Sequence, residues 1–167
     1  MRSGLCWMRW LAISAAVVAA DLASKAWISS AFHYGEVREV TSFFNLVLVH
    51  NTGAAFSFLA SEGGWQRWFF TVVAVVISIV ILVMLARHRG RRLVAVAFAL
   101  VLGGALGNLW DRLTLGHVVD FVQLHAGEHA WPAFNVADSA ITIGVVLLVL
   151  DSLRGTGPTP AGTPEKP

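Results

Sequence analysis

Four apolar runs constrain what this chain can fold into more than any other feature of its sequence. A helix that crosses a hydrocarbon core of about 30 Å needs roughly 20 mostly apolar residues. Only 13% of the residues are charged and 56% are hydrophobic, whereas soluble domains average about 25% charged residues. We therefore predict a membrane α-helical protein with four transmembrane helices in one domain, residues 1–154. The predicted spans are about 7–28, 68–86, 93–110 and 137–153.

The two ends of the chain need separate interpretation. Arg2 and Arg9 precede the first run, and Val18-Ala19-Ala20 lies inside it, so its front half has the pattern of a cleavable signal peptide. The run continues to Ile28, however, which makes it long enough to stay as a membrane helix. After the fourth run, a segment rich in Gly, Thr and Pro predicts a disordered cytoplasmic tail, residues 155–167.

The basic residues predict the orientation in the membrane. With four spans both termini lie on one side, and that side carries eight of the twelve Lys and Arg residues. By the positive-inside rule, both termini face the cytoplasm and the two long connections face outward. The pI of about 9.2 comes from short basic stretches beside apolar runs, which favour contact with membrane phospholipid and not with nucleic acid. The tryptophans expected at the outer interface are Trp65, Trp68, Trp110 and Trp131.

The first connection, residues 29–67, contains strand-like segments. Glu36–Thr41 and Phe43–His50 are rich in Val, Phe and Leu, and a third segment, 54–59, follows the turn at 51–53. We predict a small extracytoplasmic β-sheet between the first and second helices, lying against the membrane. Asn51 is either a turn residue or a group whose amide reaches a substrate backbone. Apolar contacts are expected from Phe43, Phe44, Phe56 and Phe58.

The stretch 103–121 places polar side chains directly after an apolar run. Gly103, Gly104 and Gly107 are expected to allow close helix packing at the end of the third span. A further carboxylate, Asp138, opens the fourth span three residues after Asn135, a spacing typical of a helix N-cap with a capping box. The polar residues that follow the glycines within thirteen positions are Asn108, Asp111, Arg112 and Asp120.

Asp120 and Asp138 flank a 17-residue segment that leaves the membrane and returns to it. Two carboxyl groups a few ångströms apart tend to share one proton, and such a pair can activate a water molecule and protonate a leaving group. Each carboxylate also has a structural explanation that competes with a catalytic pair. Asp138 could only cap a helix, and Asp120 could be an exposed charge on a surface strand at 118–121. The absence of His-Glu-x-x-His and Cys-x-x-Cys sequences leaves a metal mechanism without support.

Ionisable residues also lie inside the first span. Asp21 and Lys25 are four positions apart and share a helical face, so they form either a self-neutralising pair or a buried scaffold for a site. Asp111 and Arg112 can be explained as an interfacial ion pair. Because Asp21 and Lys25 also suit a proton relay, a small transporter or proton channel is the main alternative function, followed by a non-catalytic scaffold. The gathering of polar residues at one membrane face favours hydrolysis over conduction.

Five stretches, in this order along four spans, are highly specific together. They are Asp-Leu-Ala-Ser-Lys at 21–25, Asn-Thr-Gly-Ala-Ala-Phe-Ser-Phe-Leu at 51–59, Gly-Gly-Ala-Leu-Gly-Asn-Leu-Trp-Asp-Arg-Leu at 103–113, Gly-His-Val-Val-Asp-Phe at 116–121 and Phe-Asn-Val-Ala-Asp-Ser at 134–139. With these stretches the chain resembles the bacterial lipoprotein signal peptidases, the signal peptidase II family of aspartic peptidases.

The resemblance implies an aspartic endopeptidase of the bacterial cytoplasmic (inner) membrane, with its active site at the extracytoplasmic face. Its substrate would be a prolipoprotein with a diacylglyceryl-cysteine, cleaved just before that cysteine. No metal or cofactor is expected, and the protein is expected to act as a monomer. By motif match the catalytic pair would be Asp120 and Asp138. The residues that bind substrate or orient the site would be Asn51, Asn108, Arg112 and Asn135. The supporting residues would be Asp21, Lys25, Gly53 and Asp111.

Overall fold

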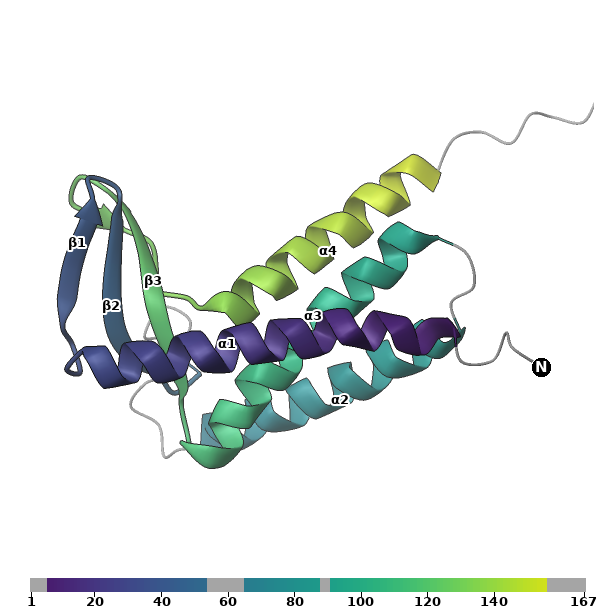
Figure 1. The fold of residues 1–167 in the computed structure, drawn as a ribbon, viewed down its shortest axis with the longest axis horizontal. Helices are drawn as coiled ribbons and strands as arrows, with labels where there is room; N and C mark the ends of the chain where they lie inside the picture. The colour runs from purple at the N-terminus through teal and green to yellow at the C-terminus, as the bar shows by residue number, and fades with distance from the viewer. Residues whose placement is uncertain (1–5, 54–64, 88–90, 156–167) are drawn as a thin grey trace, which may run out of the picture.

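The computed structural model of the chain describes residues 6–53, 65–87 and 91–155. A short 3-10 helix, η1 (Cys6–Trp10), leads into α1 (Leu11–Ala31). The other helices are α2 (Trp65–Arg87), α3 (Arg92–Thr114) and α4 (Val136–Gly155). Among the described residues, four helices are long and apolar enough to cross a membrane, which confirms the predicted fold class. Figure 1 shows the helices as one bundle with a small sheet at one end.

Helix α3 lies at the centre of the bundle and packs against α1, α2 and α4. Its glycines allow this close approach. A Cβ atom on Gly104 would collide with the carbonyl oxygen of Ala137 in α4, and one on Gly103 would lie 2.8 Å from the carbonyl oxygen of Ser14 in α1. Because there is no hydrophobic effect between helices inside lipid, their association depends on close van der Waals packing. The predicted packing role of these glycines is therefore confirmed.

Helix α3 also continues beyond its predicted end at residue 110. It ends at Thr114, so the prediction that Asp111 and Arg112 lie in a polar connection is wrong; both lie in the last turns of the helix. The backbone N–H groups of Leu115 and Gly116 donate to the carbonyl oxygen of Asp111 at 2.7 and 3.2 Å. Gly116 has a φ of 83°, a left-handed conformation that commonly ends helices. Hydropathy misses these turns because their side chains are polar while their backbone stays helical.

Within the described part of the chain, four strands form the sheet in the spatial order β1-β2-β3-β4, with each neighbouring pair antiparallel. They are β1 (Val37–Thr41), β2 (Phe44–Asn51), β3 (Val118–Ala126) and β4 (His129–Ala130). The sheet thus joins both outer connections, because β1 and β2 precede α2 whereas β3 and β4 follow α3. In the register, Asn51 pairs with Val118 and Val49 pairs with Asp120. This pairing brings the turn after β2 beside the carboxylate-bearing part of β3.

The sheet is therefore larger than predicted. Its third strand is β3, which the sequence suggested only as a surface strand at 118–121. The predicted strand at 54–59, with Phe56 and Phe58, lies outside the described residues, and so does the predicted tail beyond residue 155. Of the other two phenylalanines expected to make apolar contacts, Phe44 is half-buried and Phe43 is exposed.

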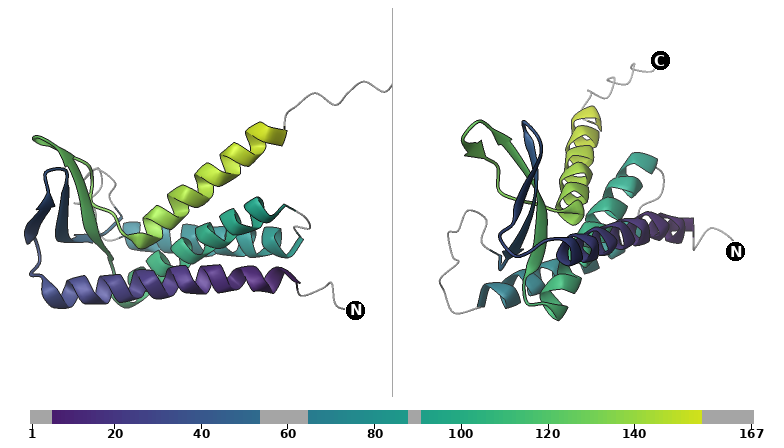
Figure 2. Two further views of the ribbon diagram at one scale, coloured as in Figure 1. Left: turned by 45° about the horizontal axis from the view of Figure 1, so that its top comes forward. Right: turned by 60° about the vertical axis from the view of Figure 1, so that its left-hand side comes forward.

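An apolar cluster attaches the sheet to the helices. Ile28 of α1 and Phe32, which follows that helix, pack with Leu48 of β2 and with Val119 and Phe121 of β3. Figure 2 shows the sheet standing across one end of the bundle, beside the end of α1 and the start of α4. The cluster therefore holds β3 at the junction of sheet and bundle, where the polar residues of the sequence gather.

Candidate active site

Asp120 lies near the start of β3 and is almost fully buried, with 2% of its surface exposed. Its neighbours Val118, Val119 and Phe121 are also buried, because this half of the strand lies between β2 and the ends of the helices. The alternative prediction of an exposed strand charge is thus wrong. A buried carboxyl group needs hydrogen-bond partners or a proton, and Asp120 has partners on two other segments.

Asn135 joins Asp120 to Asp138. Its side-chain Nδ2 donates to Asp120 Oδ1 at 2.7 Å, and its backbone N–H donates to Asp138 Oδ2 at 3.3 Å. Its Oδ1 accepts from the backbone N–H of Asp138 at 2.9 Å, which completes the predicted capping box at the start of α4. One asparagine therefore contacts both carboxyl groups, so the helix cap and the site are the same structure.

A second asparagine, Asn51, holds the other oxygen of Asp120. Its Nδ2 donates to Asp120 Oδ2 at 2.9 Å, while its Oδ1 accepts from the backbone N–H of Gly53 at 2.8 Å. Gly53 has a φ of 112°, and a Cβ there would lie 2.5 Å from the Phe70 ring. Asn51 is therefore a turn residue, as one interpretation of the sequence held, and its amide bonds Asp120; its contact with a substrate backbone stays a prediction.

Asn108 of α3 connects the carboxyl pair to a buried ion cluster. Its Nδ2 donates to Asp138 Oδ1 at 2.7 Å, and its Oδ1 accepts from Lys25 Nζ at 3.0 Å. Lys25 also forms ion pairs with Asp21 at 2.7 Å and with Asp111 at 3.0 Å. All three charged side chains are buried. Asp111 pairs with Lys25, so the predicted interfacial pair between Asp111 and Arg112 is not formed.

The two anions of this cluster also bond the backbone of the segments that carry the carboxyl pair. Asp21 Oδ1 accepts from the backbone N–H of Ala137 in α4 at 2.9 Å. Asp111 Oδ2 accepts from the backbone N–H of Val119 in β3 at 3.1 Å. Of the two roles considered from the sequence, these contacts favour a buried scaffold. Asp21 ties α1 to α4 and Lys25 ties α1 to α3, while Asp111 ties α3 to β3.

Arg112 faces an apolar groove of about 430 Å³ between α2, α3 and α4. Its Nη1 donates to the carbonyl oxygen of Asn108 at 3.2 Å, and its guanidinium lies 5.5 Å from the centre of the Phe70 ring. Asn108 and Asp138 line the same groove, together with side chains such as Ile141. The groove therefore combines an apolar length with a charged and polar end.

A second apolar hollow, of about 530 Å³, reaches Asp138 from a neighbouring face of α4. It is lined by Leu124, Trp131 and Phe134 beside the sheet and by Thr142 of α4. Asp138 is half-buried and lines both spaces. A segment bound in either one would lie next to this carboxylate.

Burial, aided by the nearby charge of Asp138, raises the pKa of Asp120 to about 7, although hydrogen bonds from Asn51 and Asn135 and the charge of Lys25 act to lower it. Near neutral pH, Asp120 is consequently divided between its protonated and charged forms. A carboxyl pair in this condition can offer one acid and one base at once. No group of three or more His, Cys, Asp or Glu side chains suited to a metal ion occurs among the described residues.

Sequence reasoning missed two features near the site. His50 and His117 stack with ring centres 3.9 Å apart. Burial and the neighbouring His50 lower the pKa of His117. Arg67, in the first turn of α2, bonds the end of α3. Neither contact has a sequence signal, because the partners lie 67 positions apart for the two histidines and at least 45 positions apart for Arg67.

A carboxyl pair where four membrane-length helices meet a small sheet is the arrangement of a membrane aspartic peptidase. The family described as Signal peptidase (SPase) II matches residues 13–154 of this chain. The chain belongs to this signal peptidase II family, as its resemblance in sequence implied.

Similar proteins and solved structures agree with this family assignment. The lipoprotein signal peptidase of Paraburkholderia phytofirmans is 57% identical over 145 residues, which cover 87% of this chain and 84% of the relative. The lipoprotein signal peptidase of Azoarcus sp. (strain BH72) is 54% identical over 158 residues, covering 95% and 90%. Two solved structures described as bacterial membrane enzymes match with TM-scores of 0.81 and 0.80, at 30% and 32% identity. They cover 93% of this chain and 94% and 99% of their own chains.

Proposed function

We propose that this peptidase removes the signal peptide from diacylglyceryl-modified prolipoproteins, cutting just before the lipidated cysteine, and that Asp120 and Asp138 activate the attacking water. The observation that carries this proposal is the contact of one residue, Asn135, with both carboxyl groups. A pair held at one residue can address one water molecule and one peptide bond. The family membership supports the substrate class.

The environments of the two carboxyl groups suggest different roles. Asp138 accepts hydrogen bonds from Asn108 and from the backbone of Asn135 at the N-terminus of α4, where the helix dipole favours an anion. Asp138 therefore serves as the base that takes a proton from water. Asp120, whose pKa burial raises to about 7, serves as the acid that protonates the carbonyl oxygen.

The reaction then balances without any further group. The water oxygen bonds the scissile carbonyl carbon, Asp138 takes one water proton, and Asp120 gives its proton to the carbonyl oxygen. When the C–N bond breaks, Asp138 passes its proton to the departing nitrogen and Asp120 recovers a proton from a hydroxyl of the intermediate. The products are a signal peptide with a new carboxyl terminus and a lipidated cysteine with a free amine.

The remaining site residues hold this geometry. Asn51, Asn108 and Asn135 orient the carboxyl groups. Arg112, at the polar end of the groove, is positioned to bind a substrate carbonyl or the developing oxyanion. The supporting residues Asp21, Lys25, Gly53 and Asp111 act through the hydrogen bonds and ion pairs described above.

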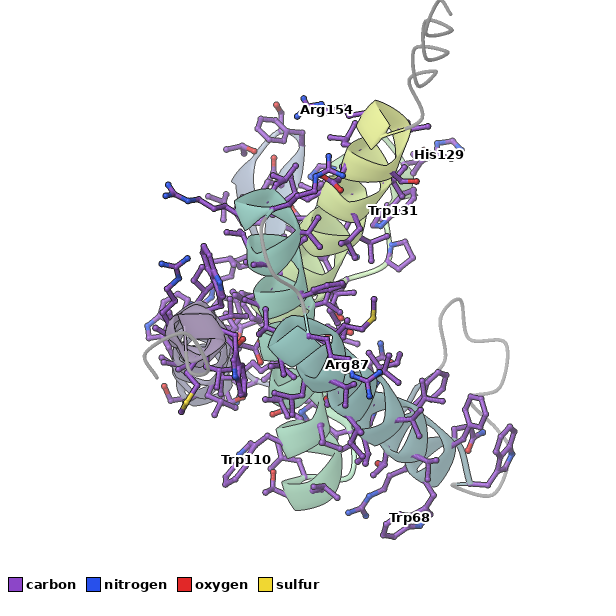
Figure 3. The ribbon with its side chains drawn as sticks, turned by 90° about the vertical axis from the view of Figure 1, so that its right-hand side faces the viewer. Trp68, Arg87, Trp110, His129, Trp131 and Arg154 are labelled. Atoms are coloured by element: carbon purple, nitrogen blue, oxygen red, sulfur yellow. The ribbon has the colours of Figure 1, made fainter. Side chains whose placement is uncertain are left out.

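The charge distribution supports an extracytoplasmic site. The basic residues at the bundle end opposite the sheet include Arg9, Arg87, Arg91, Arg92 and Arg154. We place that end in the cytoplasm, with both termini, by the positive-inside rule. Figure 3 shows Trp68 and Trp110 pointing away from the bundle. Both, like Trp131, are more than half exposed, as expected of side chains that contact phospholipid headgroups.

This placement suits the substrate. The signal peptide and the diacylglyceryl chains are apolar and remain in lipid, while only the scissile bond reaches the carboxyl groups. The site therefore brings no unpaired charge to the bilayer centre. A proton channel, the alternative, would need ionisable groups spread across the bilayer, whereas Asp21 and Lys25 are bonded into a cluster at the sheet end of the bundle. We infer a monomer, since one chain supplies every group used here.

Asp120→Asn and Asp138→Asn test the proposal, because each keeps the shape of the side chain and removes its acid–base function. We expect neither purified variant to cleave a diacylglyceryl-modified precursor, with the thermal unfolding temperature showing that each is folded. Glu39→Gln, an exposed carboxylate of β1, is the matched control and should cleave like the native protein. Turnover at the native rate by either aspartate variant would exclude the two-carboxylate mechanism.

A further inference from the structure

Arg67, in the first turn of α2, binds the end of a different helix. Its Nε donates to the carbonyl oxygen of Arg112 at 2.7 Å, and its Nη2 donates to that of Leu113 at 3.0 Å. The last carbonyl groups of a helix have no donors within it. The Leu115 and Gly116 N–H groups serve Asp111, and Arg67 serves the next two carbonyls. A cation at this position also complements the negative end of the helix dipole.

The guanidinium of Arg67 is held from several sides. It lies 5.1 Å from the centre of the Trp68 ring, within the range of a cation–π interaction. Gly116 leaves room for it, since a Cβ there would lie 3.3 Å from Arg67 Nη1. The carbonyl oxygen of Arg67 also accepts from the hydroxyl of Thr71 at 2.7 Å. Arg67 therefore has little freedom to release the end of α3.

The same face of α2 supports the side chain of Arg112. Phe70, three residues after Arg67, lies beneath the Arg112 guanidinium at 5.5 Å. Phe70 also occupies the space beside Gly53, whose N–H orients Asn51. The first turns of α2 thus hold Arg112 by its backbone, through Arg67, and by its side chain, through Phe70.

We propose that Arg67 is a positioning residue of the peptidase reaction: by capping α3 it sets where Arg112 meets the substrate. This inference rests on the proposed role of Arg112. Lysine cannot reproduce the cap fully, because its point charge lacks the planar pair of donors that reaches two successive carbonyls. Without the cap, the last turn of α3 frays and carries the Arg112 side chain with it, while the apolar groove deeper in the bundle is retained.

A double-mutant cycle tests whether Arg67 acts on the reaction through Arg112. The four proteins are the native chain, Arg67→Gln, Arg112→Lys and the double variant, each assayed for kcat and KM on a diacylglyceryl-modified precursor peptide in mild detergent. We expect Arg67→Gln to lower kcat about tenfold, since small misplacements of a catalytic group are costly, with KM changed less than about threefold. In the Arg112→Lys background the same change should cost less than about twofold, because coupled residues are not additive. Arg67→Lys should recover part of kcat.

A merely structural role gives a different pattern. Loss of folded protein lowers kcat by the same factor in both backgrounds, and that outcome would overturn the inference, as would native kcat in Arg67→Gln or in Arg112→Lys. Arg87→Gln, at the exposed far end of α2, is the control and should keep native kcat. Asp120→Asn is run in the same series, so a failure of the proposed mechanism appears there and is distinguished from a failure of the cap.

Discussion

Replacing Lys25 with methionine should destabilise the protein strongly. The Lys25 ammonium lies 2.7 Å from Asp21 Oδ2 and 3.0 Å from Asp111 Oδ2, and it donates to Asn108 Oδ1 at 3.0 Å. Methionine keeps most of the apolar stem, but a cluster of one cation and two anions becomes a pair of buried anions. The substitution therefore isolates the charge of Lys25 from its packing.

The contacts that survive set the size of the effect. Removing one partner of a buried ion pair costs about 3–5 kcal/mol. The backbone N–H groups of Ala137 and Val119 still bond Asp21 and Asp111, which favours the lower end of that range. We expect the free energy of unfolding to fall by about 3 kcal/mol, a roughly 10²-fold change in the unfolding equilibrium. Lys25→Met combined with Asp111→Asn removes one of the stranded charges and should recover more than half of the loss.

The assay is denaturant unfolding in mild detergent, followed by the fluorescence of the seven tryptophans. Arg92→Gln, an exposed cation at the start of α3, is the control, and it should change the free energy of unfolding by less than about 0.5 kcal/mol. A loss below about 1 kcal/mol for Lys25→Met, the size of an exposed ion pair, would refute the reasoning. It would mean that water or counter-ions reach the cluster and that it does not support the site.

Three further predictions follow from the site. Because burial raises the pKa of Asp120 from 3.8 to about 7, the folded state binds more protons than the unfolded state between these pH values, so stability should fall as pH rises from about 4 to about 7. Asp120→Asn should remove that pH dependence from the free energy of unfolding. The kcat of the native protein should decline above about pH 7, as the acid loses its proton. Asn135→Ala should lower kcat by roughly 10²-fold, as loss of a preorganised donor does. The control is Ser139→Ala, because the Ser139 hydroxyl donates only to the Asn135 carbonyl among its described contacts, and its kcat should stay within about twofold of the native value. Equal kcat values for the two variants would exclude a role for Asn135 in joining Asp120 to Asp138. Gly104→Ala should cost about 1–3 kcal/mol of stability by forcing α3 from the Ala137 carbonyl, and an unchanged unfolding curve would contradict that close approach.

Local patterns predicted the parts of the site that depend on near neighbours in the chain. The capping box of Asn135 and Asp138 involves residues three positions apart, and the pair of Asp21 and Lys25 involves residues four positions apart. In both, the helix itself brings the side chains together. The resemblance to the family supplied the remaining residues, but it could not supply their contacts.

The polar end of α3 shows where pattern reasoning failed. Hydropathy ended the helix at residue 110, yet it continues to Thr114. Its last turns bond Arg67, whose donors reach carbonyls 45 and 46 positions away in the chain. The same limitation led to a sheet predicted from the first connection alone, whereas β3 from the second connection completes it. An edge strand can pair with any strand that has free backbone N–H and C=O groups, so its own sequence does not predict which strand pairs with it.

The four apolar runs are sufficient to predict a four-helix membrane protein with its ionisable groups near one face, because each run must satisfy its backbone internally once it enters lipid. The folded chain is needed to show that Asp120 is buried and meets Asn51 and Asn135, which lie 69 and 15 positions away, and that Asp21 bonds the backbone 116 positions away. Such contacts depend on how whole helices and strands pack together. The helices pack closely here at glycines, and a glycine in a sequence does not indicate which helix will lie against it.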